Sequence, residues 1–263
     1  MKVMTYNILE GGNIRFGDRT ELVLDLIRQA GADVVGLCEC TGFEEERGSR
    51  FKYFRERLGM NGVLTRAPSG HHVVLLYRRG LHTFSRTTLA NTMYNGFARI
   101  AFESVELGPV TVVMTHLHPF SSWYRVTEVQ QVLGRAQSSD EAIIMGDMNN
   151  IAPTDMPLDL TAATPYLTGR FSGPDGEIDT LPIQAMLTRG FVDLGASRVG
   201  PTYPTRLERK HPEHGITVRL DYILATPGLA SRCRSIRALD ERLAHDASDH
   251  LPVVAEFDLT PVG

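Results

Sequence analysis

The chain has 263 residues, and its hydrophobic content of 42% and charged content of 22% are those of a folded globular protein, which argues against disorder or a membrane-embedded fold. This length fits one α/β domain, so we expect residues 1–263 to form a single domain. The formal net charge of −4 disfavours a protein that tracks long nucleic acids, because such proteins usually carry a basic excess that contacts phosphates.

The N-terminal segment predicts a β-α-β unit. Residues 2–9 mix β-branched, aromatic and apolar side chains, which is typical of a strand. Residues 18–30 repeat apolar side chains at helical spacing, and Gly31 is a typical C-terminal stop. The apolar run 32–40 then predicts a buried second strand with Glu39 at its end, where side chains emerge from a sheet.

The middle of the chain predicts a charge-rich helix from about Phe43 to Leu58 and then consecutive β segments without helical spacers. Such neighbours pair antiparallel. The segments cover residues 61–65, 71–79, 81–90, 96–107 and 109–118.

The second half alternates helices and strands around one aperiodic stretch. Residues 151–180 are rich in Pro, Thr, Gly and Asp, and we expect them to form a surface loop excursion that carries function. Two runs of mixed strands separated by helices predict two sheets packed face to face with helices outside, an α/β sandwich. The remaining elements are helices at 123–136 and 182–190, and strands at 141–149, 218–225, 233–239 and 251–259.

Polar side chains fall in or directly after several of these apolar strands. Charged groups are seldom buried without a partner, so their recurrence at strand ends predicts a shared site. The residues are Asn7, Glu39, His116, Asp147, Asn149, Asp221, Asp249 and His250.

Three of these residues suit a hard divalent cation. Mg²⁺ (or Mn²⁺) takes oxygen ligands and is commonly held by one or two carboxylates plus a substrate phosphate. Glu39 fits the carboxylate role, Asn7 offers an amide oxygen, and Asp249 offers a second carboxylate.

The remaining residues suit phosphate ester hydrolysis, which needs an aligned water and stabilisation of the phosphoryl oxygens. Asp147 is placed to orient or deprotonate the water, and Asn149 points to the same side of an extended segment. Asp221 and His250 form a candidate pair, because a carboxylate keeps a neighbouring imidazole protonated.

Each of these residues also has an ordinary structural explanation. Asn7 fits a turn, His116 a hydrogen-bonded core histidine, and Asp147 an Asx turn after a strand. Independent turns give no reason for their joint order, which favours a catalytic cluster. A catalytically silent protein that binds a phosphorylated ligand or a protein partner is the alternative.

The motifs that carry these residues closely resemble those of the endonuclease/exonuclease/phosphatase superfamily. They are TYNIL, the Glu39 of LCEC, THLHP, GDMNN, RLDYIL and SDHLPV, in this order from residue 4 to residue 253. The superfamily includes deoxyribonucleases, abasic-site endonucleases, inositol polyphosphate phosphatases, sphingomyelinases and deadenylases. The resemblance covers essentially the whole chain and implies a four-layer α/β sandwich with the site at the sheet edges.

The resemblance also implies roles for the site residues. Asn7 and Glu39 look like the metal-binding pair, and Asp249 like an additional metal-binding or imidazole-supporting acid. Asp147 and Asn149 look like the residues that orient water and contact phosphate. By the same likeness, Asp221 supports His250, and His116 contacts the phosphate or assists the leaving group.

Some positions depart from the family pattern. No residue clearly matches the carboxylate that supports the first histidine in deoxyribonucleases, and His71 and His72 occupy that region. We also find neither a long basic or aromatic insertion for gripping duplex DNA nor a lipid-binding hairpin rich in exposed aromatics. The further candidates for substrate contact are His71, Arg99, His118, Arg125 and Arg219.

The expected substrate is a phosphorylated molecule, either a nucleic acid or nucleotide or a small phosphoester, with small or single-stranded substrates favoured. We expect no membrane insertion, no obligate protein partner and a cytoplasmic location, since no leader or spanning segment is recognisable. Cys38, Cys40 and Cys233 are too few for a disulfide framework and are expected to be reduced, buried thiols.

Overall fold

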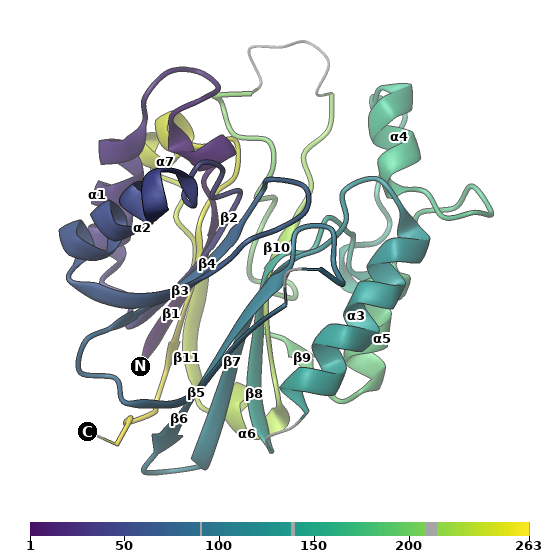
Figure 1. The fold of residues 1–263 in the computed structure, drawn as a ribbon. Coiled ribbons are helices and arrows are strands. Elements are labelled where there is room, and N and C mark those ends of the chain that lie inside the picture. The colour runs from purple at the N-terminus through teal and green to yellow at the C-terminus, as the bar shows by residue number, and fades with distance from the viewer. Residues whose placement is uncertain (90, 138–139, 209–214, 263) are drawn as a thin grey trace.

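Two six-stranded sheets lie face to face in the computed structural model, which describes residues 1–89, 91–137, 140–208 and 215–262 (Figure 1). The first sheet has the order β11 (Cys233–Ala238), β12 (Val253–Phe257), β1 (Lys2–Asn7), β2 (Val34–Cys38), β4 (Val73–Arg78) and β3 (Met60–Thr65). The second has the order β5 (Thr83–Leu89), β6 (Phe97–Ser104), β7 (Gly108–His116), β8 (Glu141–Asp147), β10 (Asp221–Ala225) and β9 (Val192–Asp193). The strand expected to reach residue 90 is confirmed as far as Leu89, and residue 90 lies outside the described residues.

Helices cover the outer face of each sheet, as the alternation of strand and helix patterns predicts (Figure 1). Their apolar faces and the outward-facing strand side chains form one core cluster on each side of the molecule. The first sheet is covered by α1 (Thr20–Ala30), α2 (Glu45–Leu58) and α7 (Arg242–Ala247), and the second by α3 (Ser122–Ala136) and α5 (Leu181–Thr188).

A third core cluster fills the space between the two sheets. The central strands are therefore buried on both faces, which explains why their sequences read as continuous apolar runs. The sheets approach closely at Gly36 of β2, where a Cβ atom would overlap the Met114 sulfur of β7. A larger residue at Gly36 would push the sheets apart.

The topology explains why polar side chains from distant segments meet at one edge. The parallel pair β1–β2 and the parallel pair β7–β8 both end at this edge, with Asn7 beside Cys38 and His116 beside Asp147. The antiparallel neighbours β12 and β10 begin there, and Asp221 at the start of β10 pairs with Asp147. The polar residues at these strand ends of both sheets therefore lie at the same end of the molecule.

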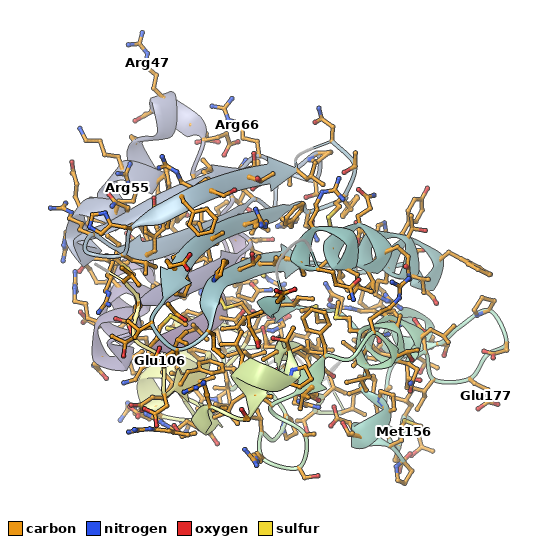
Figure 2. All side chains as sticks on the ribbon, turned by 90° about the horizontal axis from the view of Figure 1, so that it is seen from below. Arg47, Arg55, Arg66, Glu106, Met156 and Glu177 are labelled. Carbon is orange, nitrogen blue, oxygen red and sulfur yellow. The ribbon has the colours of Figure 1, made fainter. Side chains whose placement is uncertain are left out.

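Residues 151–180 are more ordered than the expected surface loop. They contain a 3-10 turn, η2 (Pro153–Asp155), and a helix, α4 (Pro165–Phe171), whose cap residue Thr164 accepts a hydrogen bond from the Leu167 N–H through its side chain. The segment packs its apolar residues into a separate small core together with Tyr203, Ile216, Val218 and Leu220. Its outer parts face solvent, as Met156 and Glu177 show (Figure 2).

The remaining differences concern short or irregular elements. Three successive residues from Glu46 to Gly48 have positive φ and interrupt the first turn of α2. The two-residue strand β9, the four-residue helix α6 (Pro227–Ala230) and the six-residue helix α7 were not predicted, because elements this short carry no periodicity.

Two simpler observations complete the fold. Cys38 and Cys40 are buried free thiols, whereas Cys233 is a partly exposed free thiol. Among the described residues, no helix combines the length and the apolar composition needed to cross a bilayer.

Candidate active site

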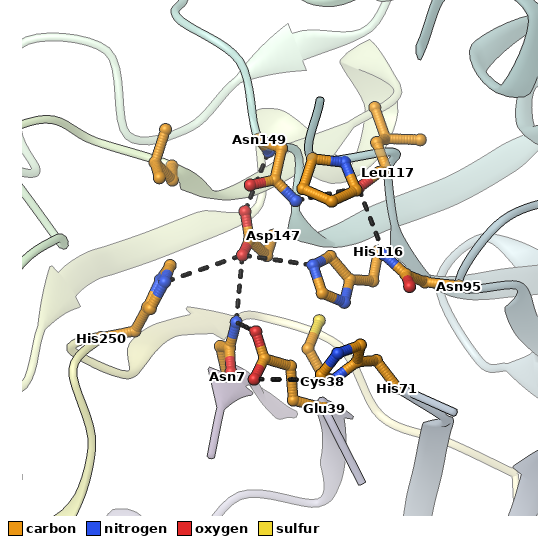
Figure 3. Close-up of polar contacts among 12 residues, drawn as sticks. Asn7, Cys38, Glu39, His71, Asn95, His116, Leu117, Asp147, Asn149 and His250 are labelled. Carbon is orange, nitrogen blue, oxygen red and sulfur yellow. Dashed lines mark hydrogen bonds and ion pairs between the residues drawn. The ribbon is translucent and has the colours of Figure 1, made fainter. Parts of the chain in front are cut away.

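Asp147 lies at the centre of the polar cluster and joins side chains from both sheets (Figure 3). Its Oδ2 atom accepts a hydrogen bond from Asn7 Nδ2 at 3.1 Å, and it lies 3.5 Å from His116 Nε2 and 3.8 Å from His250 Nε2. Its Oδ1 atom accepts the Asn149 backbone N–H at 2.9 Å. Burial opposes ionisation, but His250 and His116 outweigh it and lower the pKa of Asp147, so this carboxylate is charged at neutral pH.

Asn7 bridges Asp147 to Glu39 rather than standing free as a ligand. The same Asn7 amide nitrogen donates to Glu39 Oε1 at 3.0 Å, while Asn7 Oδ1 accepts the Leu9 backbone N–H at 3.1 Å. Both ends of the Asn7 amide thus contact the protein, and the metal-binding role of its oxygen stays a prediction. Glu39 Oε2 also accepts the Glu10 backbone N–H at 3.1 Å.

His250 and Asp221 form the expected pair, with 2.8 Å between His250 Nδ1 and Asp221 Oδ2. Burial disfavours the imidazolium, but Asp221, Asp147 and Asp249 together raise the pKa of His250 to about 10. The ring of Tyr203 packs on the imidazole with 4.8 Å between centroids. His250 is therefore protonated at neutral pH and carries a positive charge beside Asp147.

His116 lies in the site without a supporting carboxylate behind it. Its Nδ1 atom is buried and has no hydrogen-bond partner within the described part of the chain, which agrees with the missing family position. Burial lowers the pKa of His116 even though Asp147 and Glu39 oppose this effect. A neutral imidazole is a poor proton donor at neutral pH, so His116 is better suited to contact phosphate.

Asn149 connects the cluster to α4. Its side-chain amide donates to the Leu117 carbonyl at 2.8 Å, and its Oδ1 accepts a hydrogen bond from Arg170. Arg170 also helps to lower the pKa of Asp147, after burial and the two histidines. No sequence pattern singled out Arg170 because it belongs to an aperiodic stretch, although Thr164 followed by Pro165 is a recognisable helix start.

Asp249 adds a further buried carboxyl near Glu39. Burial raises its pKa to about 7, with Glu39 and Glu208 acting in the same direction and His250 opposing them. Its Oδ1 accepts a hydrogen bond from the Ser248 hydroxyl at 3.2 Å. Several acids thus share one region, where a cation would relieve their mutual repulsion.

The donor set fits a hard divalent cation. Glu39 and Asp249 are oxygen donors that line the same cleft, which is the type of partial coordination that Mg²⁺ accepts alongside substrate phosphate. Across the described ranges, no three His, Cys, Asp or Glu side chains are grouped so that they could together hold a metal ion.

The backbone is unusual at three positions in the cluster. Glu39 and Asn149 have φ of 57° and 47°, in the left-handed region that side chains with a Cβ seldom adopt. Gly146 has φ of 148°, and a Cβ there would overlap the Thr115 carbonyl oxygen. Such conformations persist only where the surroundings enforce them, and they concentrate at functional sites.

A cleft of about 460 Å³ opens over the cluster. Its walls include Glu39, His116, Asn149, Asp249 and His250 from the sheet edge. The α4 segment contributes further lining residues, which are Thr164, Pro165, Tyr166 and Arg170.

The structure separates the candidate substrate contacts into two groups. His71 lines the cleft, with its Nδ1 atom 3.8 Å from Glu39 Oε2. His118 does not line it, because its Nδ1 accepts the Phe120 and Ser121 backbone N–H groups and its ring stacks on Tyr124.

Three arginines are held in structural contacts instead of facing the cleft. Arg125 is fully buried and pairs with Asp179 at 3.2 Å. Arg99 donates to Ser85 and Thr111 along the second sheet. Arg219 is buried against two acids, Asp155 and Asp193.

Residues 4–250 match the Endonuclease/Exonuclease/phosphatase family. The chain belongs to this family. Members of the family are hydrolases that act on phosphoester bonds and generally use divalent metal ions. A search among curated proteins found no match to the chain.

Solved structures share the family fold with this chain at low sequence identity. An AP endonuclease from Archaeoglobus fulgidus is 22% identical, with a TM-score of 0.69 over 98% of this chain and 99% of its own. The human Nocturnin catalytic domain, solved with a bound sulfate anion, is 17% identical, with a TM-score of 0.65 over 99% and 93%. A humanized D. rerio TDP2 is 14% identical, with a TM-score of 0.66 over 97% of each chain. These likenesses confirm the α/β sandwich.

Proposed function

We propose that the protein is a divalent-metal-dependent phosphoesterase that hydrolyses small or single-stranded phosphorylated substrates by attack of water at phosphorus. One observation carries this proposal, namely the convergence of Asn7, His116, Asn149 and His250 on the single carboxylate Asp147. Binding alone would not require a buried carboxylate of lowered pKa beside a histidine of raised pKa.

The charge states assign a different role to each group. Asp147 is ionised at neutral pH, so it can orient the attacking water and accept its proton. His250 is protonated and stabilises negative charge that develops on the phosphoryl oxygens. Asp221 holds the His250 ring in place through the 2.8 Å hydrogen bond to Nδ1.

Glu39 and Asp249 are the residues that would hold the cation, Mg²⁺ or Mn²⁺. When bound, a divalent ion supplies neutralisation of phosphoryl charge and polarisation of the bond to phosphorus. Asn7 acts on this pair indirectly, because it fixes the Glu39 carboxylate relative to Asp147.

The α4 segment supports a role for residues 151–180 in substrate selection. Four of its residues line the cleft, whereas the catalytic carboxylates come from the sheets. If this role holds, shortening the segment should change the substrate profile. An unchanged profile would contradict it.

The test is hydrolysis of bis-p-nitrophenyl phosphate with Mg²⁺ or Mn²⁺. We expect turnover that depends on the metal, disappears with EDTA and returns when metal is restored. Asp147→Ala and His250→Ala should abolish it. The proposed activity would be excluded if the wild-type protein showed no turnover with either metal. It would also be excluded if both variants hydrolysed the substrate as fast as the wild type.

A further inference from the structure

The loop that follows β1 has an unusual backbone. Four successive residues have positive φ, between 48° and 74°, and they are Leu9, Glu10, Gly11 and Gly12. This conformation crowds the Cβ atom of a leucine or glutamate, so it persists only where contacts with the rest of the protein enforce it. The loop is packed tightly against the segment after β2, because a Cβ on Gly11 would overlap the Thr41 carbonyl oxygen.

The N–H groups of this loop hold Glu39. The Glu10 N–H donates to Glu39 Oε2 at 3.1 Å, and the Gly11 N–H donates to the Glu39 carbonyl oxygen at 2.6 Å. Asn7, at the end of β1, donates to the other carboxylate oxygen. The conformation of the loop therefore sets the position of the Glu39 carboxylate.

Arg19 binds both ends of the same loop. It lies directly before α1 and is 4% exposed. Its Nη2 donates to the Leu9 carbonyl at 2.9 Å, and its backbone N–H donates to the Gly12 carbonyl at 2.7 Å. Its Nε donates to the Arg15 carbonyl at 3.2 Å. The hydrogen bonds of Arg19 thus stabilise the left-handed conformation of the loop.

Arg19 also contacts the segment that carries Asp249. Its Nη1 donates to the carbonyl of Ala247, the last residue of α7. The final carbonyls of a helix have no partner within the helix, so a buried helix end needs a donor from elsewhere. One guanidinium therefore joins the loop that holds Glu39 to the residues just before Asp249.

The charge of Arg19 does not explain its place beside these acids. Burial lowers its pKa, and the groups that oppose this effect are Tyr6, Asp249, Glu10 and Glu39. A positive charge this close to Glu39 and Asp249 would repel a metal ion held by them. The charge of Arg19 and its hydrogen bonds would therefore have opposite effects on cation binding.

We infer that Arg19 is a positioning residue for the cation site, because it fixes the Glu39 and Asp249 carboxylates relative to each other. This inference rests on the proposed function, which assigns the cation to these two acids. The planar guanidinium of arginine donates in several fixed directions, whereas the ammonium of lysine is a single point on a flexible stem. Loss of a residue that orients metal ligands typically costs about 10- to 100-fold in metal affinity.

The test measures Mn²⁺ binding without substrate by electron paramagnetic resonance, and hydrolysis of bis-p-nitrophenyl phosphate over a range of Mg²⁺ concentrations. Arg19→Lys keeps the charge but loses the fixed geometry, so we expect its Mn²⁺ affinity to fall by about 10- to 100-fold. The Mg²⁺ concentration for half-maximal hydrolysis should rise by a similar factor, while kcat at saturating Mg²⁺ stays close to that of the wild type. Tighter Mn²⁺ binding by Arg19→Met than by the wild type would show that Arg19 acts through its charge, and would overturn the inference.

Matched controls separate positioning from general damage. Arg28→Lys changes an arginine on the surface of α1 and should leave Mn²⁺ affinity unchanged. Arg219→Lys changes a buried arginine outside the residues that line the cleft, and should lower the melting temperature without changing Mn²⁺ affinity. Equal losses of Mn²⁺ affinity in Arg219→Lys and Arg19→Lys would overturn the inference.

Arg50 provides a second test on the same loop. Its Nη2 donates to the Gly11 carbonyl at 2.5 Å, and its side chain is only half-buried, so Arg50→Lys should fold even if Arg19→Lys does not. We expect Mn²⁺ affinity to fall in this variant, by less than in Arg19→Lys. Unchanged affinity in folded Arg19→Lys, or in Arg50→Lys where Arg19→Lys does not fold, would overturn the inference.

Other results would separate this inference from the proposed activity. Mn²⁺ binding that Arg19→Lys weakens, without hydrolysis of any phosphoester, supports the positioning role and excludes the phosphoesterase. Metal-dependent hydrolysis with the same Mn²⁺ affinity and the same Mg²⁺ dependence in Arg19→Lys and wild type overturns the positioning role and leaves the phosphoesterase standing. Absence of both Mn²⁺ binding and hydrolysis in the wild-type protein overturns both.

Discussion

The floor and the rim of the cleft are built in different ways. The floor consists of side chains at or just beyond strand ends, such as His116 and His250, which contact the buried Asp147, and the register of two sheets fixes their positions. The rim consists of α4 and the turn before α3, with rings such as Tyr166 exposed by more than half. Under the proposed function, bond cleavage belongs to the floor and the choice of substrate to the rim. Substitutions in the two regions should therefore have different signatures.

The largest effect should follow loss of the central carboxylate. Asp147→Asn keeps the shape of the side chain but cannot accept a proton from water, so we expect kcat to fall by about 10³- to 10⁴-fold on every substrate. Steady-state kinetics on bis-p-nitrophenyl phosphate and on further phosphoesters measure this loss. Asp246→Asn changes an exposed acid of α7 and should have no effect. A loss restricted to one substrate class would show that floor and rim are not separable.

The next effect tests the connection between the two regions. Arg125 is fully buried and donates to Asp179 and to the Arg170 carbonyl, so it joins α3 to α4. Arg125→Ala leaves a buried acid unpaired and should reduce the free energy of unfolding by about 3–5 kcal/mol in urea denaturation. Arg234→Ala, which breaks an exposed ion pair, should leave the denaturation curve unchanged. Equal stability of Arg125→Ala and wild type would contradict the assigned role.

A pH profile tests the charge on the floor. Although burial opposes it, Asp221 and Asp147 raise the pKa of His250 to about 10, so the wild-type protein should retain this charge until the pH approaches 10. Asp221→Asn removes one of these negative charges and lowers the pKa of His250. We therefore expect kcat/KM of the variant at pH 9 to fall by about 10- to 100-fold relative to pH 7. A variant profile that matches wild type would exclude His250 as the charged group.

The smallest effect should follow substitution of Arg170, which lies about one helical turn from Tyr166 on α4. Arg170→Gln removes the positive charge near Asn149 and Asp147, and should lower kcat for bis-p-nitrophenyl phosphate about tenfold. Arg47→Gln alters an exposed cation of α2 that points into solvent and serves as the control (Figure 2). If Arg170→Gln changed only KM and left kcat unchanged, Arg170 would belong to the rim.

The floor could be predicted from the sequence because one local rule places each of its residues. Asn7, Glu39, His116 and Asp147 each end an apolar strand, and the parallel pairs bring those ends together. The rule does not reveal how the side chains are bonded. The Asn7 side-chain amide forms hydrogen bonds with the Leu9 backbone N–H, Glu39 and Asp147, and no spacing in the sequence indicates these contacts.

The rim could not be predicted in the same way. Arg170 and Tyr166 line the cleft, and their segment packs against Tyr203 and residues 216–220, a tertiary contact without local periodicity. For the same reason, the sequence could not show whether the candidate arginines face the cleft. Arg99 and Arg125 are cations near the right segments, but the structure gives both of them partners inside the protein.

The left-handed backbone conformation of Glu39 destabilises the fold at a residue that we propose to hold the cation. Glycine adopts φ of 57° without strain, whereas alanine pays about 1–2 kcal/mol there. Glu39→Gly should therefore melt above Glu39→Ala in thermal unfolding, although both lack the carboxylate. The glutamate therefore carries a conformational strain that a glycine at this position would avoid.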